Sequence, residues 1–208
     1  MVSKRRHRQR RAARGEPRRR PHKRFLVLCE GKNTEPQYIK GFKRWCRNPL
    51  VDVEIAPDHG VPRTLVERAR DLAKEAKERA RREQDDNLSY DEVWCVFDRD
   101  EHPHVDDACQ MARDNDIEIA LSNPCFELWL LLHFRESPGL QNRWDVVRML
   151  KKFVPGYDKH VDFDVYASGY EAAVVRARRL DEAARTDGEE DRNPTTGVHR
   201  MTESIREG

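Results

Sequence analysis

The sequence predicts an α/β protein with a mostly parallel β-sheet, flanked by helices, and a helical C-terminal part. Two observations lead to this fold class. Residues 25–29 and 93–97 are short, wholly apolar runs, which is typical of strands buried on both faces in a parallel sheet. The segments that follow them have apolar residues at helical spacing, so strands and helices alternate along the chain.

The first helix is expected to follow the first apolar strand closely. Thr34 resembles the N-cap of a capping box that Gln37 completes, and the helix then runs to about residue 47. Residues 51–55 alternate apolar and acidic side chains, which indicates a half-exposed strand. Residues 62–84 have apolar side chains three, four and seven positions apart, and this spacing predicts a long helix.

The second half of the chain repeats the alternation and then becomes helical. After the strand at 93–97 we expect a short helix at 105–115, a strand at 117–121, and helices that are clearest at 144–153 and 170–184. Asn123 is expected to be the N-cap of a further helix that extends through Phe134.

The predicted organisation is one domain with an appendage. Residues 1–23 form a disordered basic arm, residues 24–139 an α/β core, and residues 140–208 a helical extension packed on that core. Residues 1–24 carry a net charge of +11, whereas the whole chain carries only +2. Such an arm attracts polyanions such as nucleic acid, or it is merely a solvated leader, and both readings stay open.

Several classes of protein are excluded by the sequence. The absence of a long apolar stretch and of a secretory signal predicts a cytoplasmic protein that does not enter a membrane. The five cysteines lack metal-ligand spacing and are expected to be buried, reduced thiols. Neither GxxxxGK[ST] nor GxGxxG occurs, which argues against a site for ATP or a dinucleotide in this chain.

Three acidic residues follow the two buried strands. Glu30 comes directly after the first strand, and Asp98 and Asp100 come after the second. Ligands of parallel sheets bind at the carboxyl ends of the strands, and residues two apart in an extended segment point the same way. Three neighbouring carboxylates repel one another unless a cation is bound, and oxygen ligands select Mg²⁺ or Mn²⁺. We therefore expect a divalent-cation site, the alternative being ordinary polar strand ends.

Three further residues are weaker candidates. Glu127 lies among apolar side chains near an expected helix start, so its carboxylate needs a metal ion or an arginine as a partner. Lys32 and Lys159 follow turn residues and are either phosphate contacts or solvated loop lysines.

Three runs of sequence, in this order, resemble the RloB family. They are residues 25–35 (FLVLCEGKNTE), 97–102 (FDRDEH) and 122–134 (SNPCFELWLLLHF). The resemblance covers about residues 24–205 and includes NPTT at 193–196 and the Val198-His199 pair. That family is assigned to the Toprim fold, which topoisomerases, bacterial primases and OLD-type nucleases share.

The resemblance implies a Toprim site. Glu30 matches the glutamate that acts as general acid/base or metal ligand, and Asp98 and Asp100 match the metal-binding DxD pair. A divalent cation there stabilises charge that develops on a phosphodiester. The expected catalytic and metal-binding residues are Glu30, Asp98, Asp100 and Glu127. The expected substrate-binding residues are Lys32, Lys159 and His199.

The expected function is that of a Mg²⁺-dependent nuclease acting on DNA or RNA, including tRNA, as the effector of a bacterial defence or abortive-infection system. The resemblance also implies an ABC- or AAA-type ATPase as a partner protein. A non-catalytic nucleic-acid-binding or regulatory subunit of a defence complex is the alternative, and it would show no Mg²⁺-dependent cleavage. A phosphatase of the haloacid-dehalogenase type is disfavoured, because its DxD pair follows the first strand and precedes a threonine.

Overall fold

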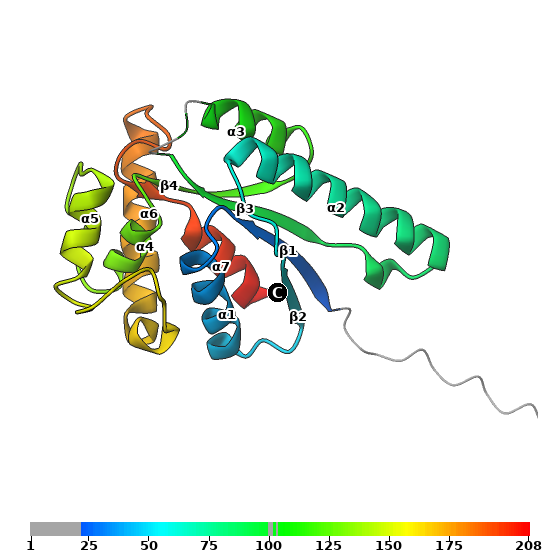
Figure 1. Ribbon diagram of the computed structural model, residues 1–208, viewed down its shortest axis with the longest axis horizontal. Helices are drawn as coiled ribbons and strands as arrows, with labels where there is room; N and C mark the ends of the chain where they lie inside the picture. The colour runs from blue at the N-terminus through cyan, green and yellow to red at the C-terminus, as the bar shows by residue number, and fades with distance from the viewer. Residues whose placement is uncertain (1–21, 100–101, 103) are drawn as a thin grey trace, which may run out of the picture.

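The protein folds around a mostly parallel sheet, as a computed structural model that describes residues 22–99, 102 and 104–208 shows (Figure 1). Nearly all of the expected basic arm, and Asp100 of the expected acidic pair, lie outside these residues. Within them the sheet has the strand order β2-β1-β3-β4-β5, in which the first four strands are parallel and β5 is antiparallel to β4. The strands are β1 (Lys23–Cys29), β2 (Val51–Ile55), β3 (Glu92–Asp98), β4 (Glu118–Asn123) and β5 (Thr195–Thr196). The predicted α/β fold class is thus confirmed.

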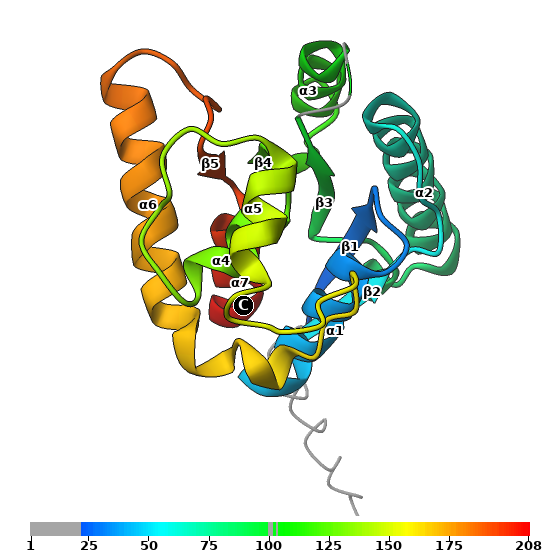
Figure 2. The same ribbon diagram turned by 60° about the vertical axis from the view of Figure 1, so that its left-hand side comes forward.

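Helices cover both faces of the sheet. Figures 1 and 2 show α2 and α3 on one face and α1 and α7 on the other, with α4, α5 and α6 grouped on the side of α7. The helices are α1 (Thr34–Cys46), α2 (Pro62–Glu83), α3 (Val105–Arg113), α4 (Glu127–Leu132), α5 (Arg143–Leu150), α6 (Tyr170–Thr186) and α7 (Val198–Glu207).

Two hydrophobic cores form because successive residues of a strand point to opposite faces. Phe25 and Val27 of β1 pack with α1, α4, α6 and α7, whereas Leu26 and Leu28 pack with α2 and α3. The first core also contains Phe163 and other side chains from beyond residue 140, so the C-terminal part shares a core with the sheet. This shared core fixes the C-terminal loops against the carboxyl ends of the strands.

The expected capping box at the start of α1 is wrong. Thr34 is the first residue of the helix rather than its cap, and Asn33 occupies the N-cap position without a capping side-chain bond. The Thr34 hydroxyl instead donates to the Lys159 carbonyl, and the Gln37 side-chain oxygen accepts from the Val161 amide. Tertiary partners in the C-terminal loop therefore replace the local capping bonds.

The expected cap at Asn123 is also wrong. The strand β4 continues to Asn123, and α4 begins only at Glu127. The Asn123 amide donates to the Asp191 carbonyl, so it ties β4 to the segment before β5.

Two other expectations concern membrane-spanning helices and the state of the cysteines. No helix in the described part of the chain is long and apolar enough to cross a membrane. The five cysteines are free thiols, and all except Cys46 are buried, as the sequence predicted.

Candidate functional site

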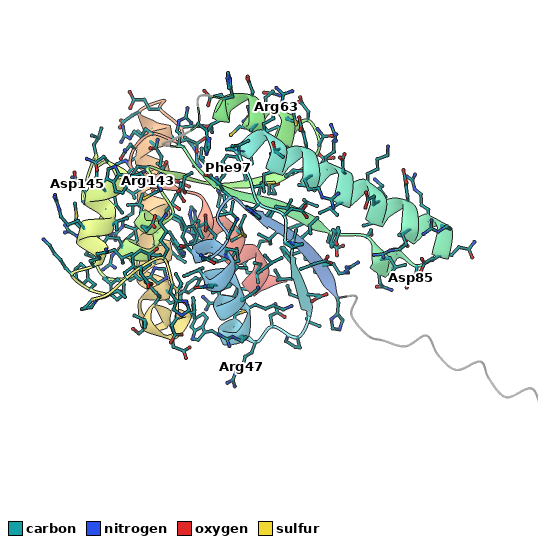
Figure 3. All side chains as sticks on the ribbon, viewed as in Figure 1. Arg47, Arg63, Asp85, Phe97, Arg143 and Asp145 are labelled. Atoms are coloured by element: carbon teal, nitrogen blue, oxygen red, sulfur yellow. The ribbon has the colours of Figure 1, made fainter. Side chains whose placement is uncertain are left out.

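A pocket of about 290 Å³ lies at the carboxyl ends of β1 and β3. Its walls come from the loop after β1, the start of α1, the end of β3, and the starts of α4 and α5. Figure 3 locates two of its borders by Phe97, the residue before Asp98, and by Arg143 at the start of α5. Five residues expected from the sequence line this pocket, namely Glu30, Lys32, Asp98, Glu127 and Lys159.

Glu30 is held against the end of β3. The register of β1 and β3 pairs Cys29 with Val96, which places Glu30 beside the last residues of β3. One Glu30 oxygen, Oε2, accepts from the Asp98 amide at 3.0 Å, and the other, Oε1, lies 2.9 Å from His102 Nε2. Both carboxylate oxygens are therefore oriented by neighbours that belong to the β3 end.

Glu35 adds a carboxylate that the sequence did not single out. It lies in the first turn of α1, is only 7 % exposed, and accepts from the Gly31 amide at 3.2 Å through Oε1. A Cβ atom at Gly31 would stand 2.3 Å from Glu35 Oε2. A side chain at position 31 would therefore displace the Glu35 carboxylate from its present place.

The surroundings of Asp98 in this pocket disfavour its ionised form. Burial, followed by repulsion from Glu35, Glu30 and Glu127, raises the pKa of Asp98 well above its usual value. The Arg143 guanidinium acts in the opposite direction and lowers that pKa. Burial also raises the pKa of Glu35. Two backbone hydrogen bonds lower that pKa in part, and repulsion from Glu127 and Glu30 raises it further. The pocket therefore disfavours having all its carboxylates ionised without a cation.

Glu127 begins α4 and faces the same pocket. Glu127 is only 3 % exposed, and the Tyr157 hydroxyl donates to Glu127 Oε1 at 3.1 Å. Burial and then repulsion from Glu127 raise the pKa of Tyr157, so the phenol stays a hydrogen-bond donor at neutral pH. Tyr157 is thus a partner of Glu127 that the sequence did not predict.

The donor types in the pocket fit a hard cation. Across the described residues, no three His, Cys, Asp or Glu side chains stand in an arrangement ready to hold a metal ion. Asp100, an expected ligand, lies outside those residues. The carboxylates of Glu30, Glu35, Asp98 and Glu127 nevertheless supply only oxygen ligands. Burial is the largest cause of the raised pKa of Asp98, and repulsion from the other three carboxylates, which a divalent cation would relieve, adds to it.

His199 does not join this pocket. It lies on α7 with 4 % exposure, its Nδ1 atom is 2.9 Å from the Thr196 carbonyl oxygen, and its Nε2 atom is 3.7 Å from an Asp181 carboxylate oxygen. Burial lowers the pKa of His199 to about 4, so the ring is neutral at pH 7. The structure thus places His199 in the contact of α7 with β5 and α6 rather than with the other expected substrate-binding residues.

Four residues near the pocket were missed as site residues in the sequence: Glu35, His102, Arg143 and Tyr157. Glu35 carried the clearest signal, since an acid in the first turn of a helix that follows a strand points back toward the strand end. Arg143 and Tyr157 carried none, because they reach the pocket only through the packing of the C-terminal part.

A family model described as RloB-like protein matches residues 25–205. No curated protein and no solved structure is significantly similar to the chain.

Proposed function

The chain belongs to the RloB-like family, and from this premise we propose that it is a Mg²⁺-dependent nuclease that hydrolyses phosphodiester bonds in DNA or RNA. The observation that carries the proposal is the convergence of Glu30, Asp98 and Glu127 on one pocket at the carboxyl ends of β1 and β3. Mutual repulsion contributes to the raised pKa of Asp98, and an oxygen-only site of this kind is suited to Mg²⁺ or Mn²⁺.

Asp98 and Glu127 would hold the cation, together with Asp100, which lies outside the described residues. A bound divalent cation stabilises the charge that develops on a phosphodiester during hydrolysis. Lys32 and Lys159 line the same pocket and are exposed, so their ammonium groups are placed to bind phosphate oxygens and to offset the charge of the carboxylates.

Glu30 and His102 are suited to proton transfer. A carboxylate and an imidazole 2.9 Å apart are within the distance over which a proton is passed between side chains. The Asp98 amide fixes the second Glu30 oxygen and so orients the pair. In this assignment Glu30 is the general acid/base, and its role as a metal ligand remains a prediction.

The proposal is tested with Asp98→Asn and Glu30→Gln. Both variants should lower cleavage of labelled single-stranded DNA, RNA and tRNA at least about 100-fold in Mg²⁺ or Mn²⁺ buffer, the size typical of losing a general acid/base. In EDTA the wild type itself should not cleave. Circular dichroism checks that they fold. Asp181→Asn is the matched control, since Asp181 is a half-buried carboxylate outside the pocket.

The outcome separates the proposal from its alternative. Wild-type cleavage in both pocket variants would reject the assignment of the site. A protein that binds nucleic acid but cleaves it under none of the metal conditions would instead be a non-catalytic binding or regulatory subunit.

We also propose a cytoplasmic role as the effector of a bacterial defence system, with an ABC- or AAA-type ATPase supplied by a partner. The support is the family membership together with the lack of a phosphate-binding GxxxxGK[ST] loop in the sequence. Co-expression with an ATPase encoded beside the gene should change the cleavage rate of the wild-type protein.

A further inference from the structure

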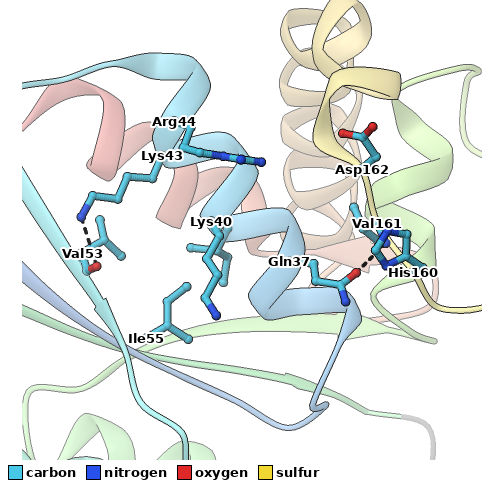
Figure 4. A pocket seen from close by; sticks show the side chains of 10 residues that line it. Gln37, Lys40, Lys43, Arg44, Val53, Ile55, His160, Val161 and Asp162 are labelled. Carbon is cyan, nitrogen blue, oxygen red and sulfur yellow. Dashed lines mark hydrogen bonds between the residues drawn. The ribbon is translucent and has the colours of Figure 1, made fainter.

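We call the pocket at the carboxyl ends of β1 and β3 the acidic pocket. Figure 4 shows a second, larger cavity, of about 740 Å³. It is bounded by α1, by the edge strand β2 and by the loop at residues 160–162. Lys40, Lys43 and Arg44 of α1 line it, whereas Asp162 is the one acid among its lining residues. We call this cavity the basic groove.

Two of these three cations are available to an external anion. Lys43 is engaged, because its Nζ atom donates to Asp52 Oδ1 at 2.9 Å and to the Val53 carbonyl at 3.3 Å. Lys40 and Arg44 are exposed and form no ion pair with any other residue that the structure describes. They are four residues apart on a helix, so they lie on the same face and point to the same groove.

A third cavity, of about 340 Å³, borders both the basic groove and the acidic pocket. This cavity shares Gly31 and Lys32 with the acidic pocket, and it shares Lys40 and Ile55 with the basic groove. Lys32 and Lys40 therefore mark a path of positive charge from the groove to the carboxylates.

The loop after α5 forms the opposite wall of both cavities. Lys159 lines the acidic pocket, and its neighbour His160 lines the basic groove. Hydrogen bonds from α1 hold this loop at two points, since Thr34 donates to the Lys159 carbonyl and Gln37 accepts from the Val161 amide. The helix α1 thus borders all three cavities, whereas this loop borders the acidic pocket and the basic groove.

From this geometry we propose that a single nucleic-acid strand enters along the basic groove, with its phosphates on Lys40 and Arg44, and places the next phosphates in the acidic pocket. This inference rests on the proposed nuclease function and adds the substrate path to it. The groove attracts a polyanion to a pocket whose own carboxylates repel one.

The depth of the acidic carboxylates favours a single strand over a duplex. Glu127 and Glu35 are 3 % and 7 % exposed, so the backbone must bend into the pocket to reach them. A flexible single strand bends in this way without breaking base pairs. The groove volume also lies in the range of about 300–1,000 Å³ in which compact ligands bind, which suits a few nucleotides.

The test compares a Lys40→Ala/Arg44→Ala variant with a Lys77→Ala/Arg81→Ala control. The control removes the same residue types at the same spacing, exposed on α2, which covers the opposite face of the sheet. Fluorescence anisotropy measures binding of labelled oligothymidylate and oligouridylate by the full chain in EDTA, over a series of salt concentrations, so that binding is recorded without cleavage.

Two lost phosphate contacts should reduce the slope of log affinity against log salt by about 1.4, and should weaken binding about 25-fold at about 0.1 M salt. The control should stay within about twofold of the wild type. The two oligonucleotides distinguish a DNA strand from an RNA strand, and a blunt duplex of either should bind more weakly.

Three results would overturn the inference. Equal losses in the groove variant and the control would show that the groove residues act only through overall charge. Equal affinity for a duplex would reject the single-strand path, and tighter binding of polyglutamate than of either oligonucleotide would indicate an acidic protein partner. Groove-dependent binding without cleavage in any metal buffer would reject the proposed nuclease activity and leave the groove as a strand-binding site.

Discussion

Replacing Tyr157 by phenylalanine should destabilise the protein by removing a hydroxyl group that is bonded to Glu127, a lining residue of the acidic pocket. That hydroxyl donates to Glu127 Oε1 at 3.1 Å. Both residues are 3 % exposed, so water cannot readily supply a substitute donor to the buried carboxylate. The ring stays in place, which restricts the change to the hydrogen bond.

The expected cost follows from the charge of the acceptor. A hydrogen bond to a charged group contributes about 1.5–3 kcal/mol, and in a chain of this size 1 kcal/mol corresponds to about 2–4 °C in Tm. Tyr157→Phe should therefore lower the Tm of the metal-free protein by about 3–12 °C. Tyr90→Phe is the matched control, because the Tyr90 hydroxyl donates to Glu54 at 2.8 Å near the surface. Its loss should cost less than about 0.5 kcal/mol.

Thermal and urea unfolding, followed by circular dichroism with EDTA, measure both costs. A double-mutant cycle with Glu127→Gln should give a coupling free energy of about 0.5–3 kcal/mol between positions 127 and 157. Saturating Mg²⁺ should shrink the Tyr157→Phe deficit, because a cation in the pocket also stabilises the Glu127 carboxylate. Equal costs for Tyr157→Phe and Tyr90→Phe, with no coupling, would refute this account of the Tyr157–Glu127 hydrogen bond.

Three further predictions concern the rest of the molecule. Asp98→Asn should raise the stability of the metal-free protein at pH 7, and the gain should be smaller at pH 5. The reason is that the pKa of Asp98 is raised in the folded state, so the wild-type protein loses stability as the pH rises through that pKa. Equal gains in Tm at both pH values would contradict this. Burial lowers the pKa of His133 and His199 from 6.5 to about 4, so the unfolded chain takes up protons first as pH falls through that window. Each histidine should cost about 2 kcal/mol of stability between pH 7 and pH 5, and His199→Gln should flatten that fall in urea titrations. Gly41→Ala should cost about 1–3 kcal/mol in urea unfolding, because its Cβ atom would stand 2.3 Å from the Phe163 Cβ atom.

The sheet could be read from the sequence where local pattern decides the structure. The apolar runs of β1 and β3 specify strands buried on both faces, and the alternation at 51–55 specifies β2 beside them. The strand β5 gave no such signal, since its two residues, Thr195 and Thr196, pair with β4 only because the C-terminal part folds back onto the sheet. The N-caps failed for a related reason, because Thr34 and Asn123 bond to distant backbone groups.

The same distinction applies to the pocket. Glu30 and Asp98 were predictable, because the end of a buried parallel strand fixes where the next side chain lies. The donor to Glu127 was not, since Tyr157 comes from a loop 30 residues further along the chain. Arg143 likewise reaches the pocket from the start of α5. The pairing of Glu30 with His102 was also missed, because nothing in the spacing of the histidines indicates it.

The walls of the acidic pocket come from both halves of the chain, and this has a consequence for the timing of biosynthesis. A ribosome makes Glu30 and Asp98 long before it makes Arg143, Tyr157 and Lys159, and the helix α7 that packs against the sheet comes later still. A nascent chain that has reached only residue 140 therefore lacks the donor to Glu127 and one wall of the pocket. The acidic pocket is therefore complete only after the C-terminal part has been synthesised and has docked on the sheet.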